Sequence, residues 1–183
     1  MKSGISSWAF RWAIGTRDFT PATPLSVFDF LEKAAQFGAE AVQICENLPL
    51  STLANGELDA VARRAKGLGL DLEIGMRGAS PENLRKHLNI AARLGVGILR
   101  VVLAASGWEP SFQEQFDILE SFLPKLEKTG TTLAIENHFA YDPEELRKFQ
   151  EADATDKCSA VVRKAVRMAA EIILKEQEAA DDA

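Results

Sequence analysis

The chain has 183 residues, of which 46% are hydrophobic, and its formal net charge is -6, from 21 basic and 27 acidic side chains. This length and apolar content are sufficient for one globular domain with a hydrophobic core. A net negative charge without a clustered basic face argues against a nucleic-acid partner and against an anionic membrane surface.

The cysteines and the N-terminus point to a reducing compartment. Cys45 and Cys158 lie far apart and show no zinc-binding or redox spacing, so neither a metal knuckle nor a disulfide framework is expected. The first residues lack the ~7 to 15 apolar positions of a signal peptide, and no later run approaches the ~18 needed to span a bilayer. These features predict a cytoplasmic chain without a membrane anchor.

A loose internal repeat of an amphipathic helix, a glycine and a short apolar run organises the sequence. Glycine closes the C-terminus of a helix without a Cβ penalty, so a glycine just before an apolar run indicates a helix-to-strand turn. Such alternation is typical of parallel strands joined by crossover helices. The four glycines of the repeat are Gly38, Gly69, Gly95 and Gly130.

The apolar runs recur at a spacing typical of barrels. They begin near Gly4, Glu40, Asp71, Gly97 and Thr131, at intervals of 26 to 36 residues. A complete eight-unit barrel of ~250 residues allots ~31 to each unit, which leaves room here for five or six. The pattern predicts an α/β fold, a parallel-strand (β/α) barrel of the TIM type that is incomplete, with about five strands in the order 1-2-3-4-5.

Capping signals support the same helix boundaries. Ser80-Pro81 and Asp142-Pro143 each place a capping side chain before a proline at the first helical position. Ser111 and Glu114 have the spacing of a capping box.

The pattern changes after Phe149, where the polar stretch 151–157 stands in place of a sixth strand. A further helix with one apolar face and an acidic tail follow it. We therefore expect a partial (β/α) barrel at residues 1–150 and a non-barrel C-terminal helix with an acidic tail at residues 151–183.

Candidate binding residues lie just after the predicted strands, because parallel α/β sheets bind ligands at the carboxyl ends of their strands. Trp8 and Trp12 can share a face and could line the entrance of a binding site, where their rings would pack against the C–H surface of a sugar. Ordinary core and loop packing is the alternative. Arg77 could bind a substrate phosphate or be a solvated surface residue. The candidates are Trp8 and Trp12 after the first strand, Asn47 after the second, Arg77 after the third, and Glu136 and His138 at the fifth.

Glu136 is the strongest candidate because it directly follows the apolar run 133–135. An ionised carboxylate at the end of a buried strand needs a metal, a cation or hydrogen-bond donors to compensate it. A metal ion is one hypothesis, and the other is an ion pair with a neighbouring arginine such as Arg77 or Arg100, or simple exposure at the rim. His138 lies two residues on, a spacing that can place an imidazole and a carboxylate around one ion.

Three polar residues interrupt the interiors of the predicted strands: Gln43, Glu73 and Arg100. Strand interiors converge in a barrel, so we expect Glu73 and Arg100 to form a buried ion pair with Gln43 nearby. The alternative is that one of them reaches a surface.

Four segments together resemble one family. Between about residue 4 and residue 149, the chain resembles the xylose-isomerase-like (β/α) barrels, which are sugar phosphate isomerases and epimerases. The segments are Gly4–Phe10, Val42–Asn47, Leu99–Val101 and Ala134–His138.

The resemblance implies an enzyme that isomerises or epimerises a sugar or sugar phosphate by proton transfer through an enediolate, which a Mn, Zn, Mg or Co ion stabilises. In the family, a glutamate on strand five is a metal ligand and a catalytic group, and this role carries over to Glu136. The remaining ligands come from strands six to eight, which have no counterpart in this sequence. We therefore expect a metal that is weakly bound or absent, and impaired or absent turnover.

Other interpretations remain open. The open sheet edges of such a chain invite pairing with a second copy. A non-catalytic, five-stranded doubly wound binding or assembly module is the main alternative, although its Gly-x-Gly-x-x-Gly turn is absent; it would have the strand order 2-1-3-4-5. The DNA-repair endonuclease branch of the same barrels is disfavoured by the negative charge and by the presence of only two histidines.

Overall fold

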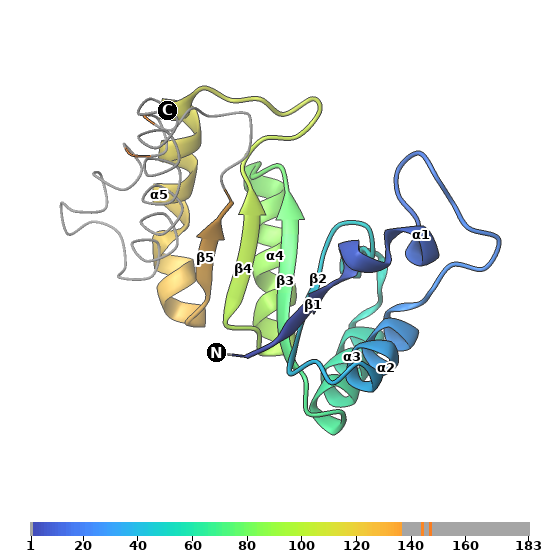
Figure 1. Ribbon diagram of the computed structural model, residues 1–183. Coiled ribbons are helices and arrows are strands. Elements are labelled where there is room, and N and C mark those ends of the chain that lie inside the picture. Colours follow the sequence, from blue (N-terminus) through green and yellow to red (C-terminus); the bar gives the residue numbers. More distant parts are fainter. Residues whose placement is uncertain (1, 137–143, 145–146, 148–183) are drawn as a thin grey trace, which may run out of the picture. The chain divides into compact units, whose positions relative to one another are not determined.

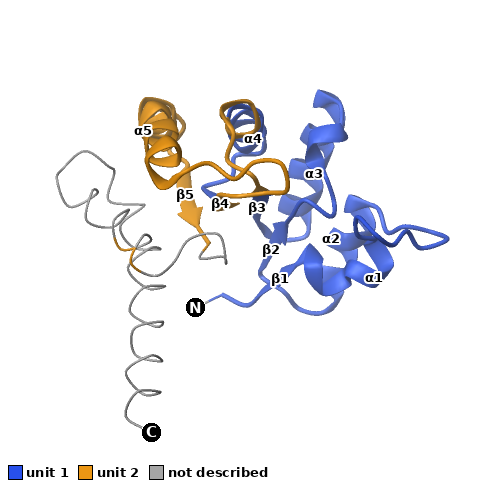
Figure 2. Cartoon of the chain, turned by 90° about the horizontal axis from the view of Figure 1, so that it is seen from above, with its two compact units in different colours: residues 1–76, 85–99 blue, residues 77–84, 100–183 orange. Residues whose placement is uncertain are grey.

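A computed structural model describes residues 2–136, 144 and 147 of the chain. Strands and helices alternate along them (Figure 1). The chain divides into two compact units, residues 1–76 with 85–99 and residues 77–84 with 100–183, which are coloured separately in Figure 2.

The described strands form one five-stranded sheet in the order β1-β2-β3-β4-β5. Strand β1 pairs in parallel with β2, and β2 with β3. The order confirms the barrel prediction and differs from that of the doubly wound alternative, and each strand starts within one residue of its predicted position. The strands are β1 (Gly4–Ser6), β2 (Ala41–Ile44), β3 (Asp71–Arg77), β4 (Ile98–Val102) and β5 (Thr132–Ile135).

In the first unit, helices α2 (Val27–Gln36) and α3 (Asn55–Gly67) supply much of the core. Helix α2 begins with a capping box in which Ser26 and Asp29 bond each other's backbone N–H groups. Phe30, Leu31 and Ala34 of α2 and Val61 of α3 are 0% exposed, so each helix buries one apolar stripe. The unit also contains η1 (Ser7–Phe10), α1 (Arg11–Ile14), η2 (Leu50–Thr52) and most of α4 (Pro81–Leu94).

Strand β1 ends before Trp8 and Trp12, as expected. We expected these two side chains to share a face, but they lie on two separate helical turns, η1 and α1. Ser6 caps η1 by accepting a hydrogen bond from the backbone N–H of Trp8, which ends the extended conformation.

The second unit is built around α5 (Phe112–Thr129), which has the predicted Ser111–Glu114 capping box. Gln115 of α5 is fully buried and donates a hydrogen bond to the carbonyl of Ala79. The turn after β3 requires glycine, because Gly78 has a φ of +78° and a Cβ there would lie 2.9 Å from the Cβ of Ala105.

All four glycines of the repeat adopt positive φ angles, between 64° and 74°. Gly130 is the left-handed C-cap of α5. The helix-to-strand turns predicted at these positions are therefore confirmed.

Several predictions lie outside the described residues: the Asp142-Pro143 cap, His138, and the helix and tail of 151–183. The boundary between residues 150 and 151 stays a prediction. Within the described part, no helix is both long enough and apolar enough to cross a membrane.

Candidate functional site

A buried serine joins the exits of β1 and β2 in the first unit. Ser7 is 0% exposed; its hydroxyl donates to Oδ1 of Asn47 at 2.6 Å and accepts from the backbone N–H of Cys45 at 2.9 Å. The amide nitrogen of Asn47 donates back to the carbonyl of Ser7 at 3.1 Å. Both ends of the Asn47 amide thus hold the loop after β2 against the start of η1.

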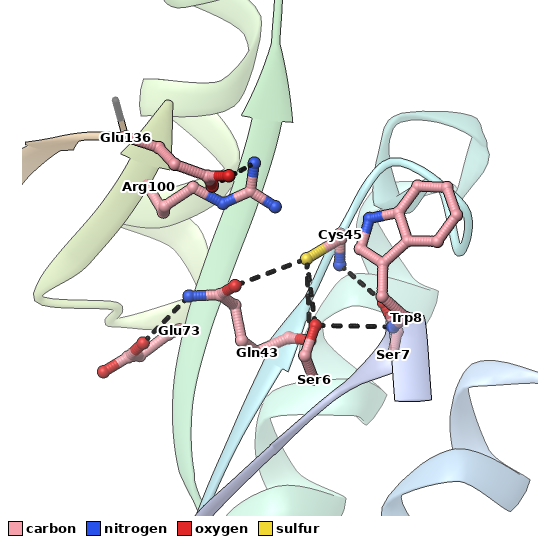
Figure 3. Close-up of polar contacts among 8 residues, drawn as sticks. All are labelled: Ser6, Ser7, Trp8, Gln43, Cys45, Glu73, Arg100 and Glu136. Atoms are coloured by element: carbon pink, nitrogen blue, oxygen red, sulfur yellow. Dashed lines mark hydrogen bonds and ion pairs between the residues drawn. The ribbon is translucent and has the colours of Figure 1, made fainter. Parts of the chain in front are cut away.

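A row of polar side chains crosses the same three strands. Ser6, Gln43 and Glu73 are register partners on β1, β2 and β3, so their side chains share one face of the sheet. Gln43 Nε2 donates to Glu73 Oε2 at 3.2 Å, and the Cys45 thiol lies 3.5 Å from Gln43 Oε1 and 3.4 Å from the Ser6 hydroxyl (Figure 3). An open pocket of about 470 Å³ on this face includes Ser6, Gln43 and Glu73 in its lining.

Glu136 and Arg100 form an ion pair in the second unit. Glu136 follows β5 directly, and its backbone N–H donates to the carbonyl of Val101 on β4 at 2.9 Å. Nη1 of Arg100 lies 3.2 Å from Oε2 of Glu136, and the two side chains are 12% and 42% exposed (Figure 3). The strand ladder therefore places the carboxylate beside a mostly buried guanidinium.

The expected ion pair between Glu73 and Arg100 would join the two units, and it stays a prediction. Glu73 accepts a hydrogen bond from Gln43, and Arg100 pairs with Glu136, each within its own unit. The hypothesis of an arginine partner for Glu136 is confirmed, with Arg100 in that place.

The remaining candidate residues differ in their surroundings. Trp8 is 37% exposed, and Trp12 is 64% exposed, with the Phe19 ring edge-on at 5.6 Å and the Arg11 guanidinium 4.9 Å from its ring centre. Arg77 is an exposed residue at the end of β3. Their roles in substrate binding stay predictions, as does that of His138.

Sequence reasoning missed the buried Ser7 and the place of Ser6 in the row, whereas the expected proximity of Gln43 to Glu73 is confirmed. The polar residues in the strand interiors were the available signal, but the register that aligns them is set by the sheet.

The described residues do not by themselves make a metal site. No group of three or more His, Cys, Asp or Glu side chains among them is placed to hold an ion. Glu136, the expected ligand, has Arg100 as its cation. Metal ligation by Glu136 therefore stays a prediction, and no chemical step below depends on it.

Comparison with known proteins gives one curated relative. The chain is 31% identical over 138 residues to 3-oxo-isoapionate decarboxylase from Pectobacterium atrosepticum, and the match covers 75% of this chain and 49% of the relative. The chain thus spans about half the length of that protein. No protein-family model matches the chain.

Solved structures share the fold. D-psicose 3-epimerase superposes with a TM-score of 0.62 at 15% identity, covering 88% of this chain and 61% of the epimerase. A xylose isomerase domain protein from Planctomyces limnophilus superposes with a TM-score of 0.58 at 13% identity, covering 87% and 58% of the two chains.

The parallel strands in sequential order, each followed by a helix or turn that leads to the next, make this an α/β protein of the (β/α) barrel class. Within that class, its fold is that of the xylose-isomerase-like proteins, and the described residues contain five of the strands. The resemblance found in the sequence is confirmed at the level of the fold.

Proposed function

We propose that this chain acts on the carbonyl group of a small sugar or sugar acid, through an enediolate, with Glu136 as the group that transfers the proton. The observation that carries the proposal is the position of Glu136: its backbone is fixed at the exit of β5, and its carboxylate is 42% exposed beside Arg100. Ligands bind (β/α) barrels at this end of the strands.

The chemistry fits both kinds of similar protein. In an isomerase or epimerase, the Glu136 carboxylate takes a proton from the carbon next to a carbonyl, and the electron pair of the broken C–H bond moves onto the carbonyl oxygen. In a decarboxylase acting on a 3-oxo acid, the electron pair of the broken C–C bond moves the same way as carbon dioxide leaves. Each route gives an enolate-type anion that is then protonated on carbon: in the first, Glu136 returns the proton that it took, and in the second, the proton comes from water through Glu136.

Arg100 orients the base. Its Nη1 holds Oε2 of Glu136, so we assign the proton transfer to Oε1. A guanidinium in a partly buried site also stabilises negative charge that develops nearby in the transition state.

The proposal includes the expectations that the comparisons leave open. They are a small sugar or sugar phosphate as the partner rather than nucleic acid or membrane, a cytoplasmic location, a divalent ion that this chain binds weakly or not at all, and turnover that is impaired. A metal of this kind would polarise the substrate oxygens.

Deuterium exchange tests the proposal. The purified chain is incubated in D₂O with a panel of ketoses, with and without Mn²⁺, and NMR measures exchange next to the carbonyl; release of carbon dioxide from a 3-oxo sugar acid is measured in parallel. We expect Glu136→Gln to lower the rate on the accepted substrate by about 10²-fold or more, because the proton acceptor is removed.

The matched control is Glu120→Gln, which removes the same charge from an exposed position on α5. The proposal fails if the unaltered chain processes neither substrate class, or if Glu136→Gln is as active as Glu120→Gln.

A further inference from the structure

The ion pair of Arg100 with Glu136 has the features of a permanent contact. Arg100 is 12% exposed, so its charge is largely removed from water and requires a nearby carboxylate. The backbone bond from Glu136 to Val101, the residue after Arg100, fixes the two strands in register. The pairing is therefore determined by the β-ladder as well as by the side chains.

This pair bears directly on metal binding at Glu136. A carboxylate that already neutralises a guanidinium attracts a second cation less strongly, and the two cations repel each other at short range in a partly buried site. The remaining described residues offer no cluster of three acidic, histidine or cysteine side chains to offset that repulsion.

We propose that Arg100 neutralises the charge of the Glu136 carboxylate and thereby opposes the binding of a divalent ion there. The guanidinium supplies the positive charge beside Glu136 that the family resemblance assigns to a metal ion, and it contacts Oε2 of the carboxylate. An ion reaches Glu136 only by sharing the carboxylate with Arg100 or by displacing it. This inference concerns charge compensation and holds whichever reaction the chain performs.

Titration of the full chain with Mn²⁺ tests the proposal, with the free ion measured by electron paramagnetic resonance. We expect weak binding by the unaltered chain. Arg100→Met and Arg100→Gln should each bind Mn²⁺ at least about tenfold more tightly, since Mn²⁺ and Mg²⁺ are commonly held by one or two carboxylates and several waters. Arg100→Lys keeps the positive charge and should bind as weakly as the unaltered chain.

Two further variants make the result specific to this pair. Adding Glu136→Gln to Arg100→Met should abolish the gain in affinity. Arg93→Met removes an arginine from a different ion pair, with Asp59 at 2.7 Å on the exposed surface, and should leave Mn²⁺ binding unchanged.

Circular dichroism establishes which variants fold. Arg100→Gln decides the question if Arg100→Met does not, because glutamine removes the charge and keeps a polar side chain in this partly buried position. The proposal is wrong if the neutral variants bind Mn²⁺ no more tightly than the unaltered chain, or if the gain survives Glu136→Gln. Tight stoichiometric binding by the unaltered chain would also contradict it. Because no turnover is measured, failure here is separate from failure of the proposed reaction.

Discussion

Ser7 shows how a single buried hydroxyl can connect two strand exits. It is 0% exposed and serves as donor to Asn47 and acceptor from the backbone of Cys45. A buried donor or acceptor that loses its partner costs about 1 to 3 kcal/mol, more than the net gain of the bond itself. The stability of the β1–β2 end of the first unit therefore depends on this side chain.

We predict that Ser7→Ala lowers the free energy of unfolding by about 1 to 3 kcal/mol, because Asn47 Oδ1 and the Cys45 N–H lose their partner. Urea unfolding measures the change. Ser3→Ala is the control, since Ser3 is exposed and its hydroxyl makes only a 3.4 Å contact with Glu40. An unchanged unfolding midpoint in Ser7→Ala would show that the hydroxyl contributes nothing to stability.

Individual residues also show the limits of inference from sequence. Glu136 was identified from its place after an apolar run, and an arginine partner was one of two hypotheses for it. The choice of Arg100 follows from the pairing of β5 with β4, and that of Gln43 for Glu73 from the register of β2 with β3. Pairings between distant segments are not encoded in the local pattern, so the sequence alone did not decide among the possible partners of Glu136 and Glu73.

Local signals predicted the elements well. Capping side chains and left-handed glycines act over a few residues, so Ser111, Glu114 and the four repeat glycines could be placed from sequence. The helical turn η1 was not predicted, because the hydroxyl of Ser6 caps it at the backbone N–H of Trp8 and a serine alone does not reveal such a cap.

The capping box of α5 predicts a local response to acid. Hydrogen bonds from the Ser111 hydroxyl and from its backbone N–H hold the pKa of Glu114 below its usual value of 4.5. The folded state thus has the lower pKa, so this contribution to stability is present above pH 4.5 and is lost as the pH falls through the folded pKa. Protonation should loosen the first turn of α5.

We expect Ser111→Ala to return the pKa of Glu114 toward 4.5, measured by NMR titration of the side-chain carboxyl. The control lies in the same protein: the pKa of Asp29, which Ser26 holds below 3.8 at the start of α2, should not change. An unaltered Glu114 pKa in Ser111→Ala would mean that the serine is not its cause.

At the scale of the whole sheet, β1 is an outermost strand among the described ones. It pairs with β2 on one side. An outer strand whose second side lacks a partner presents backbone N–H and C=O groups to other chains.

We predict that the chain self-associates through β1 and that Gly4→Lys weakens this association about tenfold or more, because lysine on an edge strand disfavours strand pairing. The substitution fits the folded chain, since a Cβ at Gly4 meets Ala41 at an ordinary 3.5 Å. Sedimentation velocity over a dilution series gives the dissociation constant.

Gly67→Lys is the matched control, because it adds the same charge at the end of α3, where a Cβ has nothing within 4 Å. If association depends on the edge of β1, Gly67→Lys should leave the dissociation constant close to that of the unaltered chain. Equal weakening by both lysines would indicate a general effect of charge on a chain of net charge -6, and a monomer at every concentration would rule out pairing through β1.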